Sequence, residues 1–222
     1  MVLTESMPCS TNLSGNLLAF SLHKDIWSGT PLPLSLNHTL IALIPKINNP
    51  CVISEFRPIS LCFVLYKILS KTIANCLRSM LPTLISQFQT SFISGRNITD
   101  NIIIAKEVIH SMRGKQGRTS WMAIKFDLEK AFDRLRWDFI EHTLYNSGLP
   151  HSLVHLIMAC ISSTSMAVLW NGSPSNSFKP ERGIRQGDSF SSYIFVLCIE
   201  SLPQLIQARV HSGEWKTIKL GQ

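Results

Sequence analysis

Hydrophobic and polar positions follow two different periods along the chain, and these periods predict both strands and helices. Residues 38–45, HTLIALIP, form a short continuous apolar run that is typical of a buried β-strand. Residues 122–127, MAIKFD, alternate with a period of two and predict a second strand. Residues 166–170, followed by Asn171 and Gly172, predict a β-hairpin.

Helical periodicity dominates the rest of the chain. Apolar residues recur three or four positions apart in residues 62–80, 99–112, 132–146, 152–161 and 189–209, and each segment is expected to be a helix. Pro203 should kink the last helix or split it in two. Strands and helices in a non-repeating order predict an α+β or mixed α/β fold.

Composition narrows the classes of protein. The 222 residues, 45% of them hydrophobic, can bury a core in one large or two small domains. The apolar runs are shorter than the ~18 residues that cross a bilayer, so no membrane partner is expected. The N-terminus lacks the cationic segment of a signal peptide. Six scattered cysteines without a CxxC pair indicate reduced thiols in an intracellular protein.

An excess of positive charge points to a polyanionic partner. The chain has 21 Lys and Arg residues against 14 Asp and Glu residues, a net charge of +7. Charge alone does not separate nucleic acid from an acidic membrane surface. Within residues 62–80, Lys67, Lys71 and Arg78 recur at helical spacing. This stripe is either a solvated helix face or a face turned towards phosphates, and both alternatives stay open.

The stretch IKFDLEKAFDRLRW, residues 124–137, carries two aspartates at the end of a predicted strand. A continuous helix would turn Asp127 and Asp133 about 240° apart, and a continuous strand would separate them by about 20 Å. A strand followed by a helix instead places Asp127 where α/β sites collect ligands and Asp133 in a first helical turn, favoured by the helix dipole. For Asp127, a helix cap and a metal ligand are equally open.

Four ordered segments resemble a known family. Residues 124–137 resemble the first catalytic motif of reverse transcriptases from non-LTR retrotransposons of the long interspersed type, most of all the plant members. HTLIALIPK at 38–46 and FRPISL at 56–61 resemble its finger motifs. QFQTSFISGRNITDN at 87–101 resembles the segment before the palm, and GIRQGDSFSSYIF at 183–195 resembles the glycine-centred nucleotide-pocket motif.

The resemblance implies a right-hand polymerase fold. Fingers would cover residues 31–118 and a partial palm residues 119–222, after a poorly structured lead-in at 1–30, with the thumb absent. The family places an Asp-Asp hairpin beyond the RQGD segment, but none of the six aspartates here is adjacent to another. We therefore expect a C-terminally truncated reverse transcriptase that is inactive alone. A non-catalytic RNA- or DNA-binding module, or a relic, is the alternative.

Catalytic roles carry over by resemblance. Polymerases of this kind use two-metal phosphoryl transfer. Asp127 would be the catalytic ligand of Mg²⁺, and the backbone carbonyl of Leu128 would help to hold one ion. Phe132 lies where the family has an aromatic residue under the sugar of the incoming deoxynucleoside triphosphate, which excludes a 2′-hydroxyl. An ordinary core phenylalanine is the alternative for Phe132.

The nucleotide pocket is also implied by resemblance. Gln186 would contact the sugar or triphosphate, and Gly187 would allow close approach of template and base. Arg57 and Lys46 would grip the triphosphate from the fingers. The family usually continues with Pro-Leu-Ser-Pro where this chain has Ser-Phe-Ser-Ser at 189–192, so the loop loses backbone constraint.

Supporting roles complete the expected site. Arg185 and Asp188 are expected to be structural, whereas Lys67, Lys71, Arg78 and Arg96, with the basic loop at 113–118, would face the RNA template or DNA primer. A functional element of this kind would act in the nucleus. A metal site on His151 and His155, four positions apart on a helix, would need a third ligand such as Cys160 and is disfavoured.

Overall fold

A four-stranded sheet and a layer of helices make up the packed part of the protein, in a computed structural model that describes residues 26, 30, 32–114 and 121–218. The strands are β1 (His38–Pro45), β2 (Phe56–Cys62), β3 (Ser165–Trp170) and β4 (Ser173–Pro174). Their order is β2-β1-β3-β4. β1 pairs antiparallel with β2 and parallel with β3, so the sheet joins segments more than a hundred residues apart.

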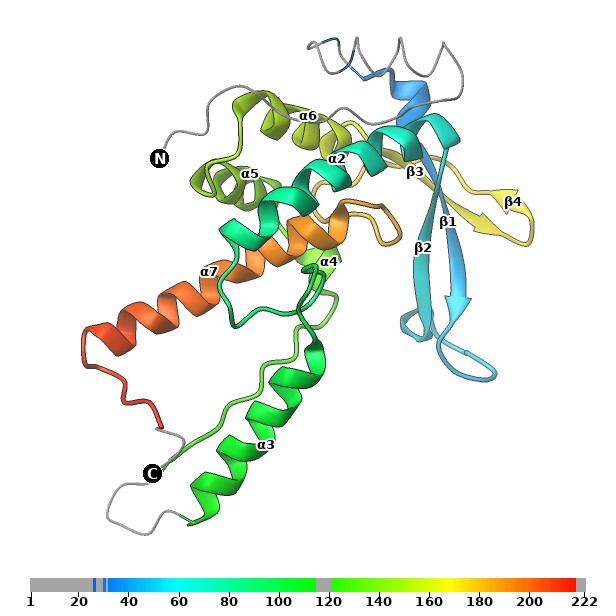
Figure 1. Ribbon diagram of the computed structural model, residues 1–222. Helices are drawn as coiled ribbons and strands as arrows, with labels where there is room; N and C mark the ends of the chain where they lie inside the picture. Colours follow the sequence, from blue (N-terminus) through cyan, green and yellow to red (C-terminus); the bar gives the residue numbers. More distant parts are fainter. Residues whose placement is uncertain (1–25, 27–29, 31, 115–120, 219–222) are drawn as a thin grey trace.

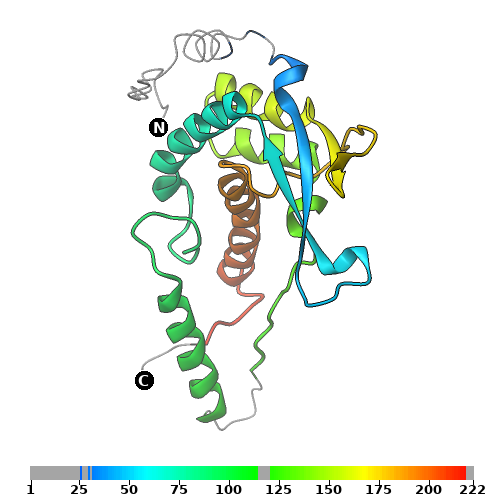
Figure 2. The ribbon, with the colours of Figure 1, turned by 90° about the vertical axis from the view of Figure 1, so that its right-hand side faces the viewer.

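The helices lie beside this sheet and extend away from it (Figures 1 and 2). The α-helices are α2 (Val64–Leu84), α3 (Ile98–Gly114), α4 (Ala131–Arg134), α5 (Trp137–Asn146), α6 (His151–Ser162) and α7 (Ser191–His211), and two 3-10 turns are η1 (Leu34–Asn37) and η2 (Ile53–Glu55). The predicted α+β class is confirmed.

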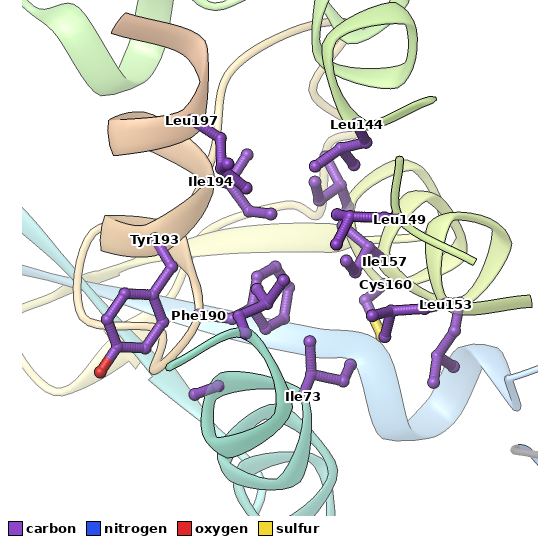
Figure 3. Packing of buried hydrophobic residues seen from close by; sticks show 14 of the residues in the cluster. Ile73, Leu144, Leu149, Leu153, Ile157, Cys160, Phe190, Tyr193, Ile194 and Leu197 are labelled. Carbon is purple, nitrogen blue, oxygen red and sulfur yellow. The ribbon is translucent and has the colours of Figure 1, made fainter. Parts of the chain in front are cut away.

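Helices α2, α5, α6 and α7 enclose the core. Buried side chains on α2 include Ile73, and those on α6 include Ile157. Phe190 lies at the start of α7 with no exposed surface and sits in the middle of this cluster (Figure 3). Each fully buried side chain of this size stabilises the fold by about 1.5–3 kcal/mol relative to exposure. The core therefore fixes the position of the loop that leads into α7.

The strand predicted at 122–127 is wrong. These residues have no regular secondary structure, and the side chains of the apolar face are exposed, with Met122 at 78% and Phe126 at 67% of their full accessibility. A strand exists only where a neighbouring backbone satisfies its N–H and C=O groups. None of the four described strands pairs with this segment. Alternation alone therefore did not make a strand.

One helix prediction also needs correction, and for another one of its two alternatives is excluded. The helix expected from Phe132 to Asn146 is broken into α4 and α5, because Leu135 and Arg136 are extended and the Leu135 carbonyl accepts from the Gly183 amide at 2.7 Å. In contrast, α7 runs through Pro203 without splitting. β2 lies in a segment for which no strand was predicted. The other strands and helices agree with the sequence patterns to within a few residues.

A second group of elements projects from the packed part. Helix α3 buries none of its described side chains, and Figures 1 and 2 show α3 and the segment 121–129 extending together away from the sheet. Helix α7 is long and apolar enough to cross a membrane by length and composition, but its first half lies in the core just described. Length and composition therefore carry little weight for this helix.

The expected division near residue 118 does not separate two packed units. Strands from both sides of it share the sheet, and helices from both sides share the core. The division into fingers and palm stays a prediction about function. Most of the lead-in at 1–30 and most of the basic loop at 113–118 lie outside the described residues.

Candidate functional site: the loop at residues 183–190

The loop begins with a glycine whose side-chain position is closed. Gly183 has φ +87°, and a Cβ atom there would lie 2.9 Å from the Asp133 carbonyl oxygen. The Gly183 amide donates to the Leu135 carbonyl, and the Ile184 amide donates to the Phe132 carbonyl at 3.0 Å. The loop is thus joined to the turn around α4, and only glycine fits this approach.

Gln186 and Gly187, the two residues predicted to line the nucleotide pocket, lie on the outer side of the loop. The Gln186 carbonyl accepts from the Ser60 amide of β2 at 2.9 Å, so the loop continues the edge of the sheet. The Gln186 amide nitrogen lies 3.5 Å from an Asp133 carboxylate oxygen. Gly187 has φ +95° and faces the Ser60 carbonyl. A cavity of about 240 Å³ is lined by residues that include Ser60, Asp133, Arg182 and Gln186.

A larger groove of about 590 Å³ also borders the loop, between it and α2. One wall is the α2 face that carries Lys67, Lys71 and Asn75, and the other is formed by the loop residues Gly187, Asp188 and Ser189. Both lysine side chains are exposed. Two of the three cations of the predicted basic stripe, Lys67 and Lys71, therefore line a concave surface beside the loop, whereas Arg78 is not among its lining residues.

Two charged residues of the loop are buried as an ion pair. A nitrogen of Arg185 lies 3.2 Å from an Asp188 carboxylate oxygen, with both side chains almost fully buried. Burial lowers the pKa of Arg185 and raises the pKa of Asp188, because removal from water disfavours both charges. The opposite charge of the partner counters each shift. The expectation that this pair is structural fits its burial.

Asp127 lies apart from these contacts on an exposed part of the chain. The cap interpretation is wrong, because the residue at the N-cap of α4 is Lys130. Asp133 does lie in the first turn of α4, as expected. Two adjacent metal ions need several shared ligands, yet no group of three His, Cys, Asp or Glu residues gathers anywhere in the described chain. Asp127 and Leu128 alone do not fit a two-metal site.

The remaining nucleotide-binding candidates are dispersed. The Phe132 ring stacks on Phe195 of α7 at 4.8 Å between centroids and packs against the core. Arg57 is exposed on β2, and the Lys46 ammonium donates to the Ser54 carbonyl at 2.9 Å within the β1–β2 connection. The described lining of the smaller cavity includes none of these three. Their contacts with nucleotide stay predictions.

Two of the predicted nucleic-acid contacts have partners inside the protein. Arg96 donates to three carbonyls in the connection after α2, at Ser86, Gln89 and Ile85, and so organises that connection. Arg78 donates through Nε to the Tyr193 hydroxyl at 3.0 Å. Both contacts with nucleic acid stay predictions. The His151 ring contacts Tyr145, with ring centroids 4.9 Å apart.

Several residues of the site were missed in the sequence. Tyr66 and Ser70 bind the buried ion pair from α2, Asn37 binds it from η1, and Thr39 binds it from the start of β1. One signal was present. Tyr66 and Ser70 are hydroxyl residues four positions apart on the apolar face of a helix, where a hydroxyl needs a partner.

Comparisons with known proteins agree with this architecture. Residues 44–219 match the reverse transcriptase (RNA-dependent DNA polymerase) family. The chain is 31% identical over 179 residues to the uncharacterized 149 kDa protein of transposon TX1 from Xenopus laevis, covering 81% of this chain and 14% of that protein. It is 30% identical over 189 residues to the polyprotein of type-2 retrotransposable element R2DM from Drosophila melanogaster, covering 83% and 17%.

A solved structure agrees in fold. Apo telomerase from Candida Tropicalis superposes with a TM-score of 0.53 at 14% identity, covering 87% of this chain and 44% of that one. The fold is therefore that of a partial reverse transcriptase. The chain spans less than a fifth of the length of the two transposon proteins. Enzymes of the family generally use a divalent metal ion. From its family match and its non-LTR relatives, the chain belongs to the reverse transcriptase (RNA-dependent DNA polymerase) family as a non-LTR retrotransposon domain.

Proposed function

We propose that the chain supplies the nucleic-acid groove and part of the nucleotide pocket of an RNA-directed DNA polymerase, and that catalysis needs further carboxylates. The observation that carries the proposal is the groove between α2 and the loop, with Lys67 and Lys71 on one wall. Such a groove suits a single strand of RNA template, whose phosphates attract lysines without regard to sequence.

The smaller cavity suits part of a nucleotide. Its volume of about 240 Å³ is below the ~300–1,000 Å³ of typical ligand pockets. It would hold one portion of a deoxynucleoside triphosphate, such as the sugar, beside Gln186. Since the groove and the cavity both border the same loop, template and nucleotide would meet near Gln186 and Gly187. Sites at Arg57, Lys46 and Phe132 remain part of this proposal.

The metal chemistry is the incomplete part. Mg²⁺ is our proposal for the divalent ion, with Asp127 and the Leu128 carbonyl as the ligands that this chain contributes. No group of three His, Cys, Asp or Glu residues that could hold a metal ion gathers among the described residues, so no catalytic step is assigned to them alone. Action on a DNA primer, and in the nucleus, belong to the same proposal.

RNA binding at increasing salt tests the groove. For single strands, log affinity falls with log salt by about 0.7 for each phosphate contact. Lys67→Gln with Lys71→Gln should therefore lower this slope by about 1.4, measured by fluorescence anisotropy with a labelled single-stranded RNA. Lys106→Gln with Lys179→Gln, two exposed lysines away from the groove, matches the change in charge and should leave the slope nearly unchanged.

Equal effects of the two double variants would contradict the groove as the binding site. No binding by the unaltered chain would favour a relic over both a polymerase part and a binding module.

A primer-extension assay distinguishes a part of a polymerase from a non-catalytic nucleic-acid-binding module. The 222-residue chain should extend no primer on an RNA template with Mg²⁺. A longer polypeptide that adds the Asp-Asp hairpin and a thumb should extend it, and Asp127→Ala should abolish that activity. Retained activity in the longer Asp127→Ala protein would reject Asp127 as the metal ligand. Activity of the 222-residue chain itself would mean that it already holds a second carboxylate in the site.

A further inference from the structure

Arg185 connects the loop to four separate elements. Its guanidinium donates to the Asn37 side-chain oxygen at 2.7 Å, the Thr39 hydroxyl at 3.0 Å and the Cys160 carbonyl at 3.1 Å, and it also contacts the Tyr66 hydroxyl. These partners come from η1, β1, α6 and α2. The planar fork of arginine can hold this many partners at once in only one orientation.

Asp188 fastens the far end of the same loop to α2. Its carboxylate accepts from the Tyr66 hydroxyl at 2.8 Å and from the Ser70 hydroxyl, and it pairs with Arg185. The Ser189 amide in turn donates to the Ser70 hydroxyl at 3.1 Å. The Tyr66 hydroxyl therefore touches both charges and closes the network between them.

Only two residues lie between these anchors, and both face outwards. Gln186 meets Ser60 of β2 and approaches the smaller cavity, while Gly187 lines the larger groove. The position of this pair relative to the sheet and to the lysine face of α2 is thus set from the two buried ends. The loop also lacks prolines at 189–192 that would stiffen its backbone.

We propose that Arg185 and Asp188, closed by the Tyr66 hydroxyl, are positioning residues that hold Gln186 and Gly187 between the two concave surfaces. This role does not reduce to stability. A buried ion pair usually contributes little more than a well-packed apolar pair of similar volume, but a fully satisfied polar network permits a single arrangement. The identity of the ligands rests on the proposed function, whereas the positioning of the loop does not.

An apolar replacement tests the positioning role. Arg185→Met with Asp188→Leu removes both charges at similar volume. Because buried partners such as Asn37, Tyr66 and Ser70 then lose hydrogen bonds, the urea midpoint should fall, and exchange is compared without urea, where the variant is folded. The Ser60 amide, which reports loop docking through the Gln186 carbonyl, should exchange about tenfold faster by NMR. Affinity for a short labelled single-stranded RNA should fall about tenfold.

The control is a second ion pair of the chain. Arg209→Met with Glu214→Leu removes an exposed pair, at 2.7 Å, outside the network and should change neither Ser60 exchange nor RNA affinity. Native Ser60 exchange and RNA affinity in the Arg185/Asp188 variant would overturn the proposal. If that variant fails to fold, Tyr66→Phe tests the proposal instead, because it deletes only the hydroxyl shared by the two charges. It should accelerate exchange of the Ser60 amide about threefold.

The two proposals can fail separately. If the unaltered chain binds no RNA, the proposed function is wrong, and Ser60 exchange still decides whether the ion pair positions the loop. If RNA binds but Ser60 exchange is insensitive to the apolar replacement and to Tyr66→Phe, the positioning role is wrong and the proposed function stands.

Discussion

The two segments most similar to polymerase motifs differ in burial: one is anchored in the core and the other is exposed. The loop at 183–190 is buried at both ends, with Phe190 fully inside the core and Asp188 paired with Arg185. The segment at 121–130 carries the predicted catalytic Asp127, yet its apolar side chains are exposed and it pairs with no described strand. Both segments resemble polymerase motifs equally clearly in sequence. The difference is that the loop is hydrogen-bonded to several other elements, whereas the segment pairs with none of the described strands.

The comparison shows what a motif needs beyond its own residues. Residues 183–190 contribute few hydrogen bonds to one another, and their order comes from η1, β1, β2, α2, α6 and the turn around α4. A strand likewise obtains its hydrogen bonds from a neighbour. The loop at 183–190 is therefore positioned by other described elements, whereas the segment that carries Asp127 is not.

Two phenylalanines give the strongest test of this contrast. Phe190→Ala should lower the free energy of unfolding by about 3–5 kcal/mol, because it opens a cavity in a closed core. Phe126→Ala makes the same chemical change on an exposed side chain and should stay within about 0.5 kcal/mol. Urea unfolding followed by circular dichroism measures both. Comparable losses would mean that the 121–130 segment is packed in solution, and the contrast would fail.

A pair of glycines sharpens the account of the loop. Gly183→Ala should cost about 1–3 kcal/mol, because the new methyl group meets the Asp133 backbone in a left-handed conformation. Gly95 has a similar φ of +79° but open space around it, so Gly95→Ala reports the cost of the conformation alone. The difference in urea midpoints isolates the contact with Asp133. Equal urea midpoints for the two variants would show that the contact with the Asp133 backbone does not contribute to the cost.

Amide exchange gives the finest comparison. The amides of Gly183 and Ile184 donate to carbonyls around α4 and should exchange at least about tenfold more slowly than those of residues 122–127. NMR or mass spectrometry resolves the two segments. Protection across 122–127 would show that this segment finds a strand partner in solution.

Local patterns predicted most elements but not their partners. Apolar periodicity placed β1, α2, α3 and α6, and the Asn171-Gly172 pair placed the β3–β4 hairpin, where both residues have positive φ. It failed for residues 122–127, since alternation only makes a strand possible. It also missed β2 and the break at Leu135, where a bond from Gly183 replaces the next helical turn.

The site divides in the same way. Gln186, Gly187 and the lysine stripe could be found from motif and spacing, because each is a feature of a short segment. Tyr66, Asn37 and Thr39 could not, because they join Arg185 and Asp188 only after β1 and α2 have packed against the loop.

The sequence by itself determined the family, the positive charge and the residues that face the groove and the cavity. These properties depend on residue identity and on spacing within one segment. Only the tertiary structure decided that β1 and β3 pair in parallel, that the buried ion pair anchors the loop, and that Asp127 stays exposed. Each of these depends on which distant backbone or side chain satisfies a polar group or covers an apolar one, and periodicity along a chain does not contain that information.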